Sequence, residues 1–251
     1  MPITFGSLFA GIGGMDLGLE RAGMECKWQV EIDDYASRVL AKHWPTVHRE
    51  KDVRQCGAGN LENVDLIAAG FPCQDISYAG KGAGLNGERS GLFYEVARIV
   101  GEMGPRYVVL ENVSALLTRG LDQVLGTLVS LGYDAEWHCI PAAYVGAPHI
   151  RNRVFVLAYM RSVRRNSFCK IFKKMPTSYF LSRDEWIKES TDIHISDGSI
   201  CRTRRMPNAN VFGVADGISN WVDRLKGLGN AVVPQVAEYI GRQIVKFEKG
   251  G

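Results

Sequence analysis

The chain has 251 residues, of which 46% are hydrophobic and 23% charged, and its formal net charge is +3. This composition is typical of a soluble globular protein, and the length fits one large domain or one domain with a small appendage. No apolar run approaches the roughly 18 residues of a membrane span, and the first residues do not form a signal peptide.

The six cysteines exclude two further classes of protein. None of them forms a CxxC pair, so the sequence indicates neither a zinc site nor a small disulfide scaffold. We therefore expect no metal, no membrane attachment and a location in the reducing cytoplasm, where thiols stay free.

Charge is distributed unevenly along the chain. Residues 160–206 hold eleven Lys/Arg and five Asp/Glu, a net charge of +6, so the rest of the chain carries −3. A basic segment on a nearly neutral body favours a polyanionic partner. On charge alone, a solvated basic face or a loop explains the segment equally well.

The first 31 residues predict a strand, a glycine turn, a helix and a second strand. Residues 3–9 are rich in β-formers, residues 10–14 hold three glycines, residues 15–22 have helical spacing, and residues 26–30 form the second strand. Glu31 ends that strand, where an acidic side chain can accept hydrogen bonds from both hydroxyls of a ribose. The pattern predicts a nucleoside-containing cofactor, and the alternative is a structural turn with a surface Glu31.

A reactive cysteine is the central prediction. Residues 64–69 form a short apolar run that predicts a buried strand, and Gly70 and Pro72 end it in a turn. Cys73 is therefore presented at the carboxyl end of a strand, where ligands gather in an open α/β sheet. Taken alone, Cys73 is more simply interpreted as a small buried hydrophobic residue, as most free cysteines are. The glycine-rich residues 74–91 predict a loop beside the site.

Further polar side chains follow the later strands. Residues 107–110 predict a buried strand that ends at Glu111, which places this carboxyl group at the same sheet edge as Cys73. Arg151 and Arg153 alternate and face the same side of an extended segment. For either arginine alone, a surface salt bridge is the simpler interpretation.

The remaining predicted elements complete an α/β pattern. They are helices over residues 92–103, 121–131 and 235–247, strands over residues 137–140 and 153–159, and a weak strand over residues 46–48. The last helix can be stable only by packing on the main sheet.

Five short motifs, in this order, resemble those of the DNA cytosine-5 methyltransferase family. The resemblance covers residues 1–159 and about 217–247, and its motifs are residues 8–14 (Leu-Phe-Ala-Gly-Ile-Gly-Gly), 70–74 (Gly-Phe-Pro-Cys-Gln), 111–113 (Glu-Asn-Val), 151–153 (Arg-Asn-Arg) and 228–232 (Leu-Gly-Asn-Ala-Val). There are two departures. His149 stands where the family usually has Gln, and the variable recognition region is short.

The resemblance implies a Rossmann-like, S-adenosylmethionine-dependent fold and a reaction. Cys73 would attack carbon 6 of a flipped-out cytosine in duplex DNA, so that carbon 5 can take a methyl group. Glu111 would hold the ring nitrogen and the amino group, Arg153 would bind the ring oxygen, and Arg151 would support Glu111 or the nearby backbone. The setting that the resemblance implies is DNA methylation, as in restriction-modification systems, although a phage or orphan role stays open.

The resemblance also implies a cofactor cleft and a partner. The cofactor would be S-adenosyl-L-methionine, bound by residues of the glycine turn, two strand ends, the cysteine turn and the C-terminal motif, which are Phe9, Gly11, Gly13, Glu31, Asp52, Pro72, Asn230 and Val232. The partner would be double-stranded DNA, bound by a monomer. We expect a catalytic domain over residues 1–159 and 217–251 and a small basic recognition lobe over residues 160–216.

Other functions stay open. A tRNA cytosine-5 methyltransferase uses the same fold, and a basic lobe does not separate RNA from DNA. An inactive member that only binds DNA is disfavoured because Cys73, Glu111 and Arg153 are all present. An NAD-type oxidoreductase is disfavoured because it would leave these residues unexplained.

Overall fold

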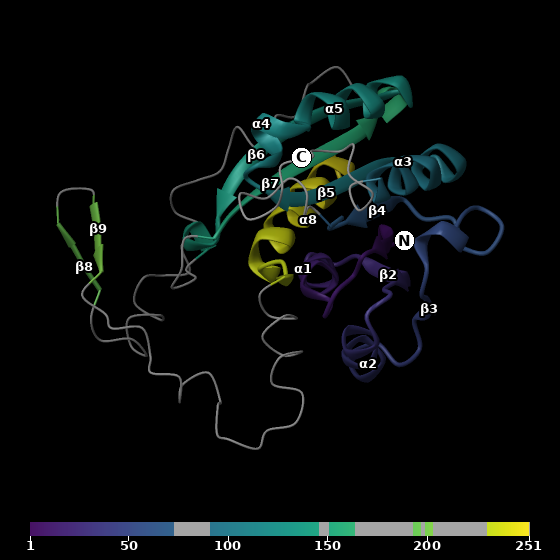
Figure 1. Ribbon diagram of the computed structural model, residues 1–251, viewed down its shortest axis with the longest axis horizontal. Helices are drawn as coiled ribbons and strands as arrows, with labels where there is room; N and C mark the ends of the chain where they lie inside the picture. The colour runs from purple at the N-terminus through teal and green to yellow at the C-terminus, as the bar shows by residue number, and fades with distance from the viewer. Residues whose placement is uncertain (73–90, 146–150, 164–192, 197–198, 203–229, 251) are drawn as a thin grey trace.

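The computed structural model describes residues 1–72, 91–145, 151–163, 193–196, 199–202 and 230–250, with only the backbone for residues 193–196 and 199–202 (Figure 1). Cys73 and His149 lie outside the described residues, as do residues 203–229. The fold that follows is built from the described part of the chain.

A seven-stranded mixed sheet forms the centre of the molecule, in the order β3-β2-β1-β4-β5-β7-β6. β1 to β5 run parallel, whereas β7 is antiparallel to both of its neighbours. The strands are β1 (Thr4–Leu8), β2 (Glu25–Val30), β3 (His48–Glu50), β4 (Leu66–Ala69), β5 (Tyr107–Val113), β6 (Tyr133–Pro141) and β7 (Asn152–Met160). This doubly wound order confirms the expected Rossmann-like α/β fold.

Helices cover both faces of the sheet. The described helices are α1 (Gly14–Arg21), α2 (Asp34–His43), α3 (Leu92–Met103), α4 (Leu116–Arg119), α5 (Leu121–Ser130) and α8 (Pro234–Glu248), with short 3-10 turns η1 (Val53–Gln55), η3 (Ala142–Val145) and η4 (Arg161–Val163). α3, α4 and α5 share one hydrophobic cluster with the sheet, and α1 and α8 share the other. None of these described helices is long and apolar enough to cross a membrane.

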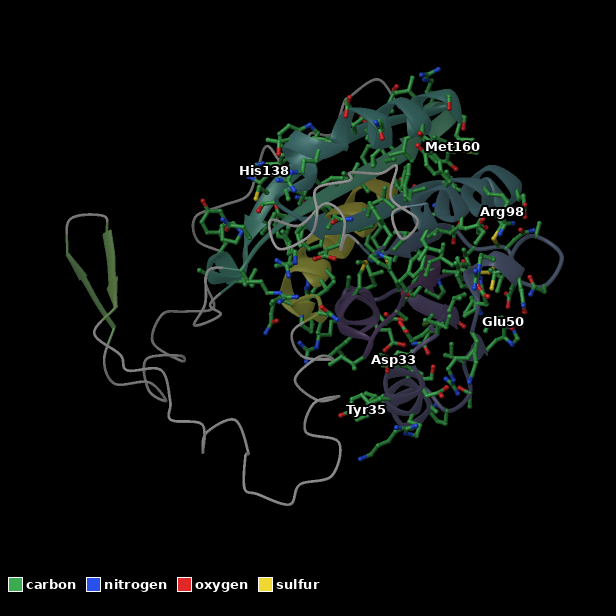
Figure 2. All side chains as sticks on the ribbon, viewed as in Figure 1. Asp33, Tyr35, Glu50, Arg98, His138 and Met160 are labelled. Atoms are coloured by element: carbon green, nitrogen blue, oxygen red, sulfur yellow. The ribbon has the colours of Figure 1, made fainter. Side chains whose placement is uncertain are left out.

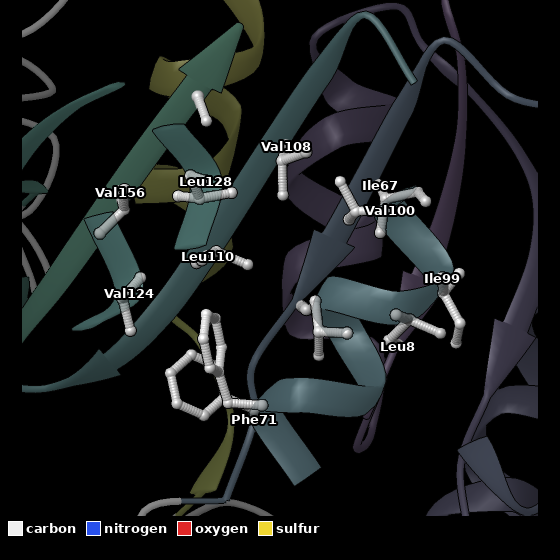
Figure 3. Close-up of a cluster of buried hydrophobic side chains, with 14 of the residues drawn as sticks. Leu8, Ile67, Phe71, Ile99, Val100, Val108, Leu110, Val124, Leu128 and Val156 are labelled. Carbon is white, nitrogen blue, oxygen red and sulfur yellow. The ribbon is translucent and has the colours of Figure 1, made fainter. Parts of the chain in front are cut away.

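The two clusters explain why the central strands are apolar throughout. In β4, Leu66 and Ala68 belong to the α1/α8 cluster, whereas Ile67 and Ala69 belong to the α3/α5 cluster. Successive side chains of a strand point to opposite faces, so a strand covered on both faces must be apolar at every position. Figure 3 shows Ile67, Val108 and Leu110 from this sheet packed in the α3/α5 cluster.

The packing of the last helix is as expected from the sequence. Val236, Ile240 and Ile244 of α8 are buried in the same cluster as Phe5 of β1 and Leu66 of β4. The C-terminal segment therefore belongs to the body of the sheet, although α8 begins at Pro234 and β7 ends at Met160.

Some elements differ from the sequence-based expectation. α2 was not predicted: Asp33 caps it by accepting from the Ala36 N–H at 3.0 Å, but only Ala36 and Leu40 are buried, so its apolar stripe is thin. β3 begins at His48 rather than ending there, and β6 is longer than the predicted residues 137–140. Element ends are the part of a fold that local patterns predict least well.

Two strands lie in the basic segment. β8 (Ile193–Ser196) and β9 (Ser199–Arg202) pair antiparallel as a separate two-stranded sheet. The sequence did not predict this hairpin. The division of the chain into a catalytic domain and a recognition lobe remains a proposal.

Candidate active site

The carboxyl ends of the parallel strands gather the predicted residues at one edge of the sheet. Phe9 follows β1, Glu31 follows β2, and Glu111 lies near the end of β5. Arg153 of β7 pairs in register with Val113, so the antiparallel strand brings the arginine motif to the same edge. The topology therefore unites residues that are more than a hundred positions apart.

The buried Glu111 forms an ion pair with the partly buried Arg153. The Arg153 Nε lies 2.9 Å from Glu111 Oε1, and the side chains are 21% and 9% exposed. Burial raises the pKa of the Glu111 carboxyl to about 7, although the positive charges of Arg153 and Arg151 lower it. A carboxyl group in this balance can hold or release a proton near neutral pH.

The neighbouring Asn112 fixes the backbone that leads to the cysteine. Its Nδ2 donates to the Phe71 carbonyl at 3.3 Å, and both residues are buried. The Phe71 ring packs against Phe93 of α3, with ring centroids 5.3 Å apart. Pro72 comes next and is half-buried, and Cys73 then lies outside the described residues. These two contacts fix the position of Phe71, which lies two residues before Cys73 in the sequence.

Arg151 links the arginine motif to the C-terminal motif. Its backbone has a positive φ of 28°, which is uncommon for a residue with a side chain. Its Nη2 donates to the Ala231 carbonyl at 2.9 Å. Burial and the nearby Arg153 lower the pKa of its guanidinium. The hydrogen bond to Ala231 supports one of the two roles considered for Arg151, which is contact with nearby backbone.

The glycine turn is held against Glu31. The Gly11 N–H donates to Glu31 Oε2 at 2.7 Å, and the Asp33 N–H donates to Oε1, also at 2.7 Å. Burial raises the pKa of Glu31, although these two N–H donors lower it. Gly13 caps α1 with φ 85°, and a side chain there would also meet the Trp44 ring. Glycine is therefore required at position 13 by both conformation and space.

The C-terminal motif lies against the same turn. A Cβ on Gly14 would collide with the Val232 carbonyl oxygen, so α1 begins directly beside the segment that precedes α8. Val232 is half-buried, and Asn230 is exposed. Phe9 is half-buried and has φ 55°, a strained backbone of the kind found at functional sites.

Asp52 lies at the end of the neighbouring strand. The Glu31 N–H donates to the Glu50 carbonyl at 3.0 Å, which joins the ends of β2 and β3, and Asp52 follows two residues later. The Asp52 carboxylate accepts from the Arg54 N–H at 3.1 Å and pairs with the Arg54 guanidinium at 2.8 Å. These bonds lower the pKa of Asp52 and keep it ionised, so it can accept further hydrogen bonds.

Sequence reasoning missed three features of this region. Ile32 is 63% exposed beside Glu31, where it can cover a planar ligand. Asn112 was seen as part of a motif, but its bond to Phe71 depends on strand order. Asp16 is fully buried beneath the glycine turn. An acidic residue in the first turn of a helix with small neighbours was the only local signal for it.

No group of three or more His, Cys, Asp or Glu side chains that could hold a metal ion occurs within the described ranges. Three lysines of the basic segment, Lys170, Lys173 and Lys174, lie outside those ranges.

Comparison with known sequences identifies the family. The profile of the family "C-5 cytosine-specific DNA methylase" matches residues 3–198. The chain is 39% identical over 181 residues to Type II methyltransferase M.Eco47II of Escherichia coli, covering 68% of this chain and 42% of that protein. It is 33% identical over 170 residues to M.HhaI of Haemophilus parahaemolyticus, covering 66% and 52%. The chain thus spans about half the length of the curated relatives it matches.

Solved structures share the fold. A candidate DNA modification methyltransferase encoded within an E. coli prophage superposes with a TM-score of 0.70 at 21% identity, over 98% of this chain and 99% of that chain. The S. pombe Dnmt2 methyltransferase superposes with a TM-score of 0.67 at 15% identity, again over 98% and 99%. Because the family profile covers most of the chain and spans the cysteine, Glu-Asn-Val and arginine motifs, the chain belongs to the C-5 cytosine-specific DNA methylase family.

Proposed function

We propose that this protein transfers a methyl group from S-adenosyl-L-methionine to carbon 5 of a flipped-out cytosine in duplex DNA. The observation that carries the proposal is the ion pair between the buried Glu111 and Arg153 at the sheet edge, beside the hydrogen-bonded backbone that leads to Cys73. Membership of the family and the Type II methyltransferase relatives support the same activity.

The first step would be addition of the Cys73 thiolate to carbon 6 of the cytosine. The new S–C6 bond moves the electron pair of the C5–C6 double bond toward carbon 5, which makes carbon 5 nucleophilic. Glu111, with its pKa raised to about 7 by burial, can supply a proton toward ring nitrogen 3 as the charge develops. Arg153 holds Glu111 in place and can reach the ring oxygen.

Methyl transfer and release complete the cycle. When bound, S-adenosylmethionine supplies an electrophilic methyl group for carbon 5. A base then removes the proton from carbon 5, the S–C6 bond breaks, and ring nitrogen 3 returns its proton to Glu111. The C5–C6 double bond, the Glu111 carboxyl group and the free Cys73 thiolate are thereby restored. No side chain in the described residues clearly takes that proton, and water is the proposed base.

The cofactor would lie across the ends of β1, β2 and β3. The Gly11 side of the turn is open, since a Cβ there would meet no atom within 4 Å. Glu31 would accept from the ribose hydroxyls, Asp52 from the adenine amine, and Ile32 would cover the adenine. Phe9, Gly13, Pro72, Asn230 and Val232 would complete the cleft. An open backbone turn flanked by acceptors and one exposed apolar side chain fits a nucleoside.

We further propose that residues 160–216 form a small DNA-facing lobe and that the protein acts with a restriction-modification system. The Type II methyltransferase relatives support that setting. The cytoplasmic location and the monomeric state stay predictions from the sequence.

A trapping experiment tests the reaction. Duplex DNA that carries 5-fluorocytosine at the target cannot lose fluorine in place of the proton, so the Cys73 adduct should persist after methyl transfer. Bisulfite sequencing of DNA from expressing cells first identifies the target. We expect a protein–DNA band on a denaturing gel for the natural protein and none for Cys73→Ser.

The controls separate the alternatives. A band that survives Cys73→Ser would show that another residue is the nucleophile. A band formed with 5-fluorocytosine RNA but not with DNA would favour the tRNA methyltransferase. Binding of DNA without any band, in the presence of cofactor, would favour an inactive DNA-binding member.

A further inference from the structure

The segment that carries Asp52 is tied to α3 by one arginine. Arg98 lies in α3, and its Nη2 donates to the carbonyl oxygens of Val53 at 3.2 Å and Cys56 at 2.8 Å. Both carbonyls belong to η1 or its C-terminal cap. Figure 2 labels Arg98 beside the segment that follows Glu50. The contacts join residues 42 and 45 positions apart, so no local pattern predicts them.

Two glutamates of α3 orient the arginine. Its Nε donates to Glu95 at 2.9 Å, and its Nη1 donates to Glu102 at 2.8 Å. Glu102 also accepts from the Ala58 N–H at 3.3 Å, so it contacts the segment directly. A Cβ on Gly57 would lie too close to Glu102 Oε2, so a side chain at this position would collide with Glu102. Arg98 and Glu102 therefore hold residues 53–58 from one side, and we call this pair the α3 clamp.

The opposite end of η1 is capped by Asp52 itself. Its side chain accepts from the Arg54 N–H, so the position of the carboxylate and the position of the turn are coupled. An exposed ion pair contributes little by itself. The α3 clamp differs because the fork of Arg98 also binds two main-chain carbonyls, which sets where the turn lies.

We propose that Arg98 and Glu102 are positioning residues that hold Asp52 where it accepts the adenine amine of the cofactor. This inference rests on the proposed function, because it assigns the α3 clamp to the adenine end of the S-adenosylmethionine cleft. Val53 and Cys56 are themselves buried in the core, so the competing possibility is that apolar packing alone places the turn.

The test compares two ligands that differ only in the base. One is S-adenosylhomocysteine, and the other is its deaminated analogue, in which a ring carbonyl replaces the adenine amine. The unsubstituted protein should bind the adenine compound about 10- to 100-fold more tightly in calorimetry, since a hydrogen bond to a carboxylate is lost in the analogue.

Variants of the α3 clamp should lose this selectivity rather than affinity in general. Arg98→Gln is expected to reduce the ratio of the two dissociation constants about 3- to 10-fold, chiefly by weakening the adenine compound. Glu102→Gln, at a side chain 40% exposed, should reduce it less and is a second variant in case Arg98→Gln fails to fold. Arg242→Gln is the matched control, because Arg242 also pairs with a glutamate four residues away on its own helix.

The outcomes are distinct. An unchanged ratio in both α3 clamp variants, while the natural protein prefers adenine, overturns the positioning role and leaves the proposed function standing. An equal loss of affinity for both ligands also overturns it, because that is the result of a merely structural contact. If the natural protein binds neither ligand, the proposed cofactor fails and the inference fails with it.

Discussion

Two buried acidic side chains show how surroundings decide the role of one chemical group. Glu111 faces Arg153 at the sheet edge, whereas Asp16 accepts from Ser7 Oγ at 3.2 Å and Gln29 Nε2 at 2.9 Å, both neutral donors. Asp16 lies in the first turn of α1, is fully buried and has no role in the proposed reaction. Its hydrogen bonds instead join α1 to β1 and β2, so we assign it a structural role.

Asp16 should make stability depend on pH. Burial raises the pKa of its carboxyl from 3.8 to about 6. Between these values the folded protein keeps a proton that the unfolded chain has released, so the free energy of unfolding falls as pH rises. Asp16→Asn removes this effect. The free energy of unfolding of the variant minus that of the natural protein should increase by up to about 3 kcal/mol between pH 4 and pH 7.

Urea denaturation at a series of pH values measures this difference. Asp34→Asn is the control, because Asp34 is 70% exposed and its pKa is lowered by Lys51. Its effect should therefore have the opposite sign. A stability difference for Asp16→Asn that does not change with pH would show that folding leaves the pKa of Asp16 unchanged.

At the level of elements, α1 and α8 are joined by an unusually close contact. A Cβ on Gly18 would lie 2.6 Å from the Ala237 Cβ, and one on Gly241 would lie 2.7 Å from the Ala22 Cβ. Small residues at these positions let the two helices approach each other. The same contact brings Val232 against Gly14, so helix packing also builds one wall of the proposed cofactor cleft.

Alanine at two helical glycines should therefore have opposite effects. Gly18→Ala should destabilise the protein by about 1–3 kcal/mol, because its added methyl group collides with the α8 backbone. Gly126→Ala in α5 should stabilise it by about 0.5–1 kcal/mol, since a Cβ there meets nothing within 4 Å. Chemical denaturation of both variants tests the pair. Equal effects would mean that the helices separate readily at Gly18.

At the level of the whole molecule, charge separates two regions of the chain. Residues 160–206 carry a net charge of +6 and the rest carries −3. This distribution favours binding of a polyanion to the basic segment, whereas the proposed reaction takes place at the sheet edge. Lys170, Lys173 and Lys174 are expected to meet phosphates, and Arg202, Arg204 and Arg205 are candidates for base contacts.

Replacing Lys170, Lys173 and Lys174 with alanine should weaken binding to every DNA sequence. The log–log dependence of affinity on salt should become flatter by about 0.9 for each lost phosphate contact. Fluorescence anisotropy over a salt series measures both quantities. The control removes the same charge from the body, at Lys42, Lys51 and Lys246. Similar losses in both variants would mean that net charge, and not this segment, attracts the DNA.

Local patterns were sufficient for much of the fold. The runs that became β1, β4 and β5, the stripe of α3 and the apolar face of α8 were all predicted, because hydrophobic period and glycine or proline breaks act over a few residues. α2 was not predicted because only Ala36 and Leu40 of its residues are buried, although Asp33 is a typical helix-capping residue. Motif order also sufficed to place Glu111, Arg153 and Glu31 among the functional candidates.

What the sequence determined by itself was therefore most of the elements, the family resemblance and the set of candidate reactive residues. The tertiary structure alone decided which of them meet. It showed Arg153 beside Glu111, Arg151 on the Ala231 carbonyl and Arg98 on the η1 turn. The physical reason is that β1 pairs with β2 and β4, and β5 with β7, through contacts that no residue spacing encodes. Strand order is set by burial of both sheet faces at once, which is a property of the whole chain.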